Sequence, residues 1–130
     1  MRKKLQLLLI VLLMGTVGFA QNNKTTWPEM KKFHSMMAAT FHPTEEGNFA
    51  PLKAKADSLV ILSSLWLESA IPSTYKAEET KKALISLSIK CHAILKAVIA
   101  KFSDDKLKIL IGEAHEIFHK IIGECVKPGS

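Results

Sequence analysis

The stretch SDDKLKILIGEAHEIFHKIIGEC, residues 103–125, decides the fold. Ser103 is a favoured helix N-cap, and Asp104 and Asp105 place negative charge at the positive end of the helix dipole. Apolar side chains then alternate at steps of four and three residues, the spacing of one buried helix face. This stripe consists of Leu107, Ile111, Ala114, Phe118, Ile121 and Cys125. We therefore predict an amphipathic helix that begins after Ser103 and ends before Pro128.

A similar stripe occurs at the start of the globular part of the chain. Thr26 and Glu29 form a capping-box pattern around Trp27, with Pro28 in the first turn, so a helix is expected to begin near Trp27. Pro43 is expected to end it, leaving HPTEEGN as a turn. The predicted buried face consists of Trp27, Met30, His34, Met37 and Phe41.

Two more stripes lie between these helices. We expect Asn48 to cap the second helix, Pro72 to end it, and Ser73 or Thr74 to cap the third. The second stripe consists of Leu52, Ala56, Leu59, Ser63 and Trp66, and the third of Leu84, Ser88, Cys91, Leu95, Val98 and Phe102. Four stripes with short connections predict an all-α fold, an antiparallel up-down-up-down four-helix bundle over residues 27–127.

The first 20 residues have the pattern of a secretory signal peptide. The run MRKKLQLLLIVLLMGTVGFA is basic, then apolar, and ends with Gly18 and Ala20 at the positions expected before a cleavage site. Residues 21–26 would follow as a short polar tail. This predicts a periplasmic or secreted protein with no stable membrane insertion after cleavage.

Charge and motifs exclude several function classes. Removing Arg2, Lys3 and Lys4 with the leader lowers the 18 Lys and Arg to 15, which against 12 Asp and Glu leaves a net charge of +3. The remaining lysines are spread along the chain without interleaved aromatic residues, so no nucleic-acid partner is expected. The chain has no nucleophile elbow, phosphate loop or inward carboxylate pair, and we predict no enzymatic activity.

Three histidines are predicted to share one layer of the bundle. Counted from the turns at one end, His34 and His92 each lie 11 residues away and His115 lies 12 residues away. His34 is expected at the centre of its stripe, and the other two on the flanks of theirs. His119 follows His115 at i+4, the spacing that lets one helix give two nitrogens to one ion.

This layer predicts a transition-metal site for copper, zinc or nickel. His34, His115 and His119 are the expected ligands, and the shell would be completed by His92, Met37 or Cys91. Imidazole suits all three metals, whereas a thioether or thiolate ligand favours Cu(I).

A second, weaker cation site is predicted at the first turn. His42, Glu45 and Glu46 lie there, close to the expected positions of Asp104 and Asp105. A histidine that interacts with the C-terminal end of the helix dipole is the alternative interpretation.

The same counting argues against an intrachain disulfide. Cys91 and Cys125 are predicted to lie about 15 Å apart along the bundle, which is beyond the limit of about 7 Å between bonded Cα atoms. Cys91 is then a buried thiol or a soft ligand. Cys125 is left as a free thiol, a metal ligand or a link to another chain.

Two alternatives to metal binding remain. Met30 and His119 match in depth, which resembles the axial Met/His pair of cytochrome b562 and implies b-type haem, with Met37 as the alternative methionine and His115 as the alternative histidine. No Cys-x-x-Cys-His is present for c-type haem. The other alternative is a non-catalytic stress or interaction module, in which a second protein or a second copy is the partner and the histidines are structural.

Three motifs also resemble those of small exported helical-bundle proteins of Bacteroidetes-type bacteria. They are W-P-x-x-x-x-F-H, T-F-H-P-x-E-E-G-N and E-x-H-x-x-F-H-x-I. The resemblance covers nearly the whole predicted mature chain and implies a periplasmic bundle without implying an activity. It points to Trp27, His34, His42, Glu46, Gly47, Asn48, His115, His119 and Cys125.

Overall fold

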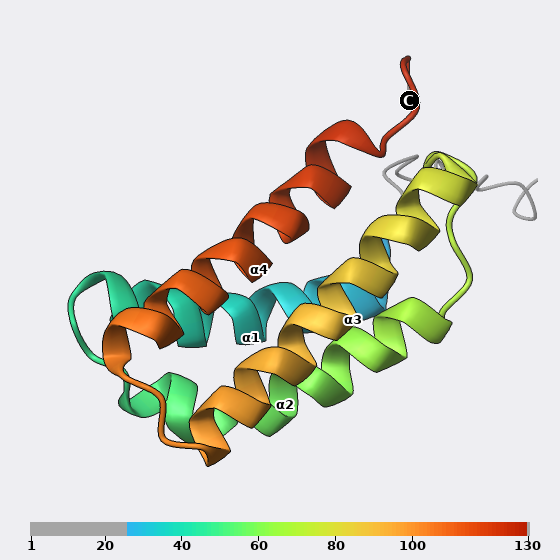
Figure 1. The fold of residues 1–130 in the computed structure, drawn as a ribbon. Helices are drawn as coiled ribbons and strands as arrows, with labels where there is room; N and C mark the ends of the chain where they lie inside the picture. The colour runs from blue at the N-terminus through green and yellow to red at the C-terminus, as the bar shows by residue number, and fades with distance from the viewer. Residues whose placement is uncertain (1–25, 130) are drawn as a thin grey trace, which may run out of the picture.

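Four helices form the structure, a computed structural model that describes residues 26–129 (Figure 1). They are α1 (Pro28–Glu45), α2 (Ala50–Glu68), α3 (Ala77–Ile99) and α4 (Asp104–Glu124). Each helix packs against the next, and α1 touches α4 less extensively than the consecutive pairs touch each other. The predicted all-α four-helix fold is confirmed. The predicted signal peptide, residues 1–20, and all of the polar tail except Thr26 lie outside the described residues.

The buried faces of α2 and α4 agree with the predicted stripes. All five predicted residues of α2 are buried, and so are all six residues of the stripe that begins at Leu107 and ends at Cys125. Ser103 is the N-cap of α4, where its Oγ accepts a hydrogen bond from the backbone N–H of Lys106 over 3.3 Å. Within residues 26–129, no helix is long and apolar enough to cross a membrane.

The buried face of α1 was predicted correctly only for Trp27 and Met37. The helix turns Phe33 into the core, whereas His34 is exposed and Met30 and Phe41 are only partly buried. Phenylalanine gains more than histidine from burial, because its ring carries no polar nitrogen that needs a partner. The buried residues of the helix are Phe33, Met37, Thr40 and Thr44.

The buried face of α3 was also predicted wrongly, because it is rotated relative to the expected stripe. Only Leu84 and Cys91 of that stripe are buried. The buried residues of the helix are Thr80, Ala83, Leu84, Leu87, Cys91, Ile94 and Ala97. The helix also begins later than predicted, with Lys76 rather than Ser73 or Thr74 as the N-cap.

Pro43 does not end α1, contrary to the prediction. The helix continues to Glu45, and the next turn is closed by two backbone hydrogen bonds, from Asn48 to the Pro43 carbonyl over 2.9 Å and from Gly47 to the Thr44 carbonyl over 3.0 Å. This pair of bonds, with Gly47 at φ +81°, is a Schellman motif. The stretch HPTEEGN is therefore the last helical turn and its cap. The N-cap of α2 is Phe49 rather than Asn48.

An aromatic cluster holds the other end of the bundle. Trp27 meets Trp66 edge-on with ring centroids 5.5 Å apart and lies 5.0 Å from Tyr75. Its Nε1 donates a 2.8 Å hydrogen bond to Ser69 Oγ. The chain after α4 is tied to the same region by an isolated bridge between Tyr75 and Val126. These contacts fix the ends of α1 and α4 and so position their facing sides.

Candidate functional site

A pocket between α1 and α4 collects four of the five histidines in the chain. They are His34, His42, His115 and His119. The cavity has a volume of about 280 Å³, and its other lining residues are Met37, Ala38, Phe41, Glu45 and Phe118. The structure therefore brings together the three predicted principal ligands, together with residues from the predicted second site.

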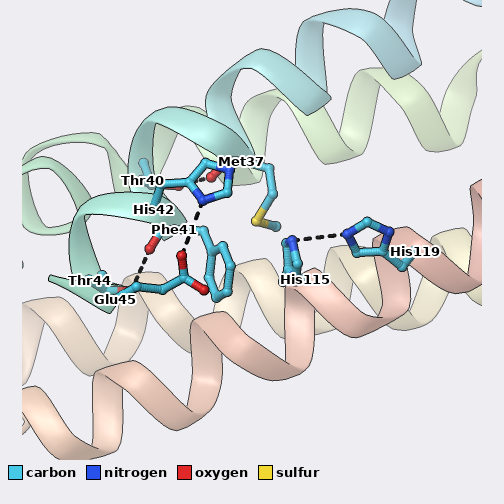
Figure 2. A network of polar contacts seen from close by, with 8 residues as sticks. All are labelled: Met37, Thr40, Phe41, His42, Thr44, Glu45, His115 and His119. Carbon is cyan, nitrogen blue, oxygen red and sulfur yellow. Dashed lines mark hydrogen bonds and ion pairs between the residues drawn. The ribbon is translucent and has the colours of Figure 1, made fainter.

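His115 and His119 form the centre of this group. Their Nε2 atoms are 3.0 Å apart, and Figure 2 shows the two rings turned toward each other on one face of α4. Such a distance requires one ring to donate an N–H and the other to present a lone pair. The i, i+4 spacing of the two histidines thus places two imidazole nitrogens next to each other.

Two residues of α1, Phe41 and Met37, lie next to the His115 ring. The Phe41 ring stacks on the His115 ring with centroids 3.8 Å apart and an interplanar angle of 13°. Met37 is 1% exposed, and in Figure 2 its thioether extends toward the His115 ring. A stacked aromatic ring and a buried thioether therefore restrict the positions that His115 can take.

The second predicted cation site joins the first. His42 Nδ1 lies 3.3 Å from Glu45 Oε2, and both residues line the same pocket as His115 (Figure 2). They reach it because α1 continues through Pro43. Glu46 is exposed and lies outside the pocket.

The acidic pair at the start of α4 is not part of this arrangement. Asp104 Oδ1 instead forms an ion pair with Lys53 Nζ over 2.9 Å, which links the first turns of α4 and α2. Of the acidic residues predicted near His42, the one in contact with it is therefore Glu45, on its own helix.

His34 lines the pocket from its rim. Its ring stacks on Phe118 with centroids 5.0 Å apart and an interplanar angle of 21°. The residue is exposed rather than central to the core as predicted. It remains one helical turn away from Met37 on the side that faces α4.

His92 and Cys91 do not reach the pocket. His92 is exposed on α3, where its Nδ1 lies 2.8 Å from the Ser88 carbonyl oxygen. Cys91 points into the core, and burial raises the pKa of its thiol to about 12, although a hydrogen bond with Ser63 acts in the opposite direction. His92 and Cys91 were predicted at the depth of His115, but His92 faces solvent and Cys91 faces the core. Neither residue therefore lines the pocket that contains His115 and His119.

Both cysteines are buried and free. Cys125 lies near Tyr75, whose hydroxyl pKa is raised mainly by burial and further by the Cys125 side chain.

The electrostatics of the pocket favour a neutral His115. Its pKa is lowered, first by burial and then by the charges of His119 and His42, while Glu45 and Glu116 act in the opposite direction. A metal ion binds neutral imidazole, so this shift reduces the competition from protons near neutral pH.

The chain matches no protein-family model, curated protein or solved structure. Among the described residues, no group of three or more His, Cys, Asp or Glu side chains is arranged to hold a metal ion. The convergent nitrogens of the pocket are two, those of His115 and His119. Any further ligand must come from another donor type or from a side-chain rotation.

The role of Phe41 was missed from the sequence. It was assigned to the buried stripe, whereas its ring lies against His115. The sequence contains a signal that would have revealed this, because Glu-Glu-Gly-Asn at 45–48 is typical of a helix C-terminus with Gly47 in the left-handed conformation. A helix continued to Glu45 places Phe41, His42 and Glu45 within its last turns.

Proposed function

We propose that this protein is an exported four-helix bundle that binds a transition-metal ion in the pocket between α1 and α4. The ion is copper, zinc or nickel, and His115 and His119 provide its first two ligands. The observation that carries the proposal is the 3.0 Å separation of their Nε2 atoms inside a pocket with two further histidines. Export to the periplasm or the exterior is supported by the leader pattern of residues 1–20.

The distance between the two nitrogens suits chelation. With metal–nitrogen bonds of about 2.0–2.1 Å, a separation of 3.0 Å corresponds to a nitrogen–metal–nitrogen angle of about 95°. Small rotations of the exposed His119 ring open this angle further. His34 and His42 line the same pocket and are available as outer ligands or as hydrogen-bond partners of bound water.

Haem binding has less support than ion binding. Of the two methionines predicted as axial ligands, Met30 does not line the pocket that contains His115 and His119, whereas Met37 does. The cavity of about 280 Å³ is also at or below the range of about 300–1,000 Å³ typical of pockets for small organic ligands.

Affinity measurements on matched variants test the proposal. Mature protein, purified without a histidine tag, would be titrated with Cu²⁺, Zn²⁺ and Ni²⁺ by isothermal calorimetry. We expect one equivalent of at least one ion to bind, and we expect His115→Ala to weaken that binding at least 100-fold. His92→Ala is the matched control, because it removes an imidazole at the same depth outside the pocket, and it should leave the affinity unchanged.

Two results would contradict the proposal. Equal affinities of the wild type and His115→Ala would place the ion elsewhere. A wild-type protein that binds none of the three ions, and whose melting temperature none of them changes, would favour the interaction module with structural histidines.

A further inference from the structure

We infer that the pocket selects monovalent copper, with the thioether sulfur of Met37 as the third ligand beside the two imidazoles. This inference rests on the proposed metal binding at His115 and His119. It adds the identity of the ion and a ligand from the opposite helix. The geometry that points to it is the side chain of one buried methionine that ends beside His115, in the pocket that His119 also lines (Figure 2).

Met37 differs from an ordinary core methionine because its side chain ends at the pocket. The residue is 1% exposed, yet it lines the pocket, so its side chain lies between the core and the site. Its thioether extends toward His115 in Figure 2. By contrast, the neighbouring Met36 is partly buried against the core and does not line the pocket.

The remaining donors make a harder ion a poor fit. Zn²⁺ is normally held by four ligands drawn from thiolate, imidazole and carboxylate. Among residues 26–129, no three such side chains are suitably arranged. The carboxylate that lines the pocket, Glu45, is engaged with His42 over 3.3 Å. A methionine thioether is a soft ligand that selects Cu(I), and together with the two imidazoles it would give a set of three ligands.

The pocket also limits movement of the ligands. The ring of Phe41 stacks on His115 with centroids 3.8 Å apart, and Met37 of α1 is packed in the core of the bundle. An ion that joins the Met37 sulfur to the α4 imidazoles would therefore bridge α1 and α4, the adjacent helices that touch least extensively. Binding of Cu(I) is thus expected to stabilise this side of the bundle.

The test compares two ions on two methionine variants. Cu(I) affinity would be measured anaerobically by competition with the chelator bathocuproine disulfonate, and Zn²⁺ affinity by competition with a fluorescent zinc chelator. Met37→Leu keeps the volume of the side chain and removes the sulfur. We expect it to weaken Cu(I) binding at least tenfold and to change Zn²⁺ binding less than twofold. Met36→Leu is the matched control and should change neither affinity.

The outcomes separate this inference from the proposal beneath it. If Met37→Leu binds Cu(I) as tightly as the wild type while His115→Ala does not, metal binding stands and the thioether ligand is refuted. If the wild type binds Zn²⁺ more tightly than Cu(I), the inferred selectivity is refuted as well. If neither ion binds the wild type, both the inference and the proposed function fail. X-ray absorption of the Cu(I) protein should show a copper–sulfur contact that Met37→Leu lacks.

Discussion

The two sides of the bundle use different chemistry at similar depth. Between α2 and α3, Cys91 and Ser63 are buried within an apolar core, and the Ser63 hydroxyl donates a hydrogen bond to the Val60 carbonyl oxygen. Between α1 and α4, the helices touch less extensively, and His115 is stacked against Phe41 beside a histidine-lined pocket. The first side therefore contributes to stability, and the second is available for a ligand.

The comparison shows that the face a residue occupies on its helix matters more than its depth in the bundle. His92 and His115 were predicted to share a layer, yet one faces solvent on α3 and the other faces α1. On a helix, a shift of one residue rotates a side chain by about 100°.

The largest effect is expected from Leu87→Ala in the core of α3. Leu87 is fully buried, so its truncation should lower the free energy of unfolding by about 2–5 kcal/mol through lost burial and the cavity left behind. Urea unfolding measures this change, and calorimetry should show an unchanged metal affinity in the folded variant. A large loss of affinity would mean that the two sides are coupled rather than independent.

A smaller effect, confined to the pocket, is expected from Phe41→Leu. Loss of the ring that stacks on His115 should weaken metal binding about tenfold, as is usual when a partner that orients a ligand is removed. Phe102→Leu is the control, because Phe102 is an exposed phenylalanine whose ring instead lies near Lys106 Nζ. Equal affinities for the two variants would show that Phe41 does not position His115.

The turns that follow α1 and α3 offer a test of about 1 kcal/mol. Both are Schellman motifs, but the left-handed position is Gly47 at φ +81° in the first and Lys101 at φ +57° in the second. A residue with a side chain is strained there, so Lys101→Gly should raise the free energy of unfolding by about 0.5–1 kcal/mol. Gly47→Ala should lower it by about 1 kcal/mol, although no atom lies within 4 Å of the added Cβ. A destabilised Lys101→Gly variant would contradict this account.

The smallest effect concerns the pH dependence of the metal-free protein. The pKa of His115 is lowered from its ordinary value of 6.5 in the folded state, where it faces His42 and Glu45 of α1 and His119 and Glu116 of its own helix. As pH falls below about 6.5, the unfolded chain binds a proton that the folded chain resists, so stability decreases. Urea unfolding between pH 7.5 and 5.5 should show this decrease, and His115→Gln should reduce it. An equally steep decrease in His115→Gln would rule out His115 as a source.

The fold and the buried faces of α2 and α4 were predictable from the sequence, because the apolar residues of these two helices fit a single buried face. In α4, every apolar step from Leu107 to Cys125 coincides with a buried residue. In α1, the apolar spacing is compatible with burial of either Phe33 or His34, so the spacing alone did not identify the buried residue. The phenylalanine is buried because the imidazole would lose its hydrogen bonds to water.

The candidate site was only partly predictable for a related reason. The depth count grouped His34, His92 and His115, and the i, i+4 spacing added His119. The pocket contains His34, His115 and His119 but not His92. The depth count separated His42 and Glu45 from them because Pro43 was expected to break the helix. Their true positions depend on the Schellman cap at Gly47, which preserves one more turn of α1.

The most direct test of the account is a crystal structure of the mature protein loaded anaerobically with Cu(I), with the copper located from its anomalous scattering. The account predicts one strong anomalous peak between α1 and α4, within bonding distance of His115 Nε2, His119 Nε2 and the Met37 sulfur. A peak beside His92 or at the chain termini, or no ordered copper in the α1–α4 pocket, would contradict it.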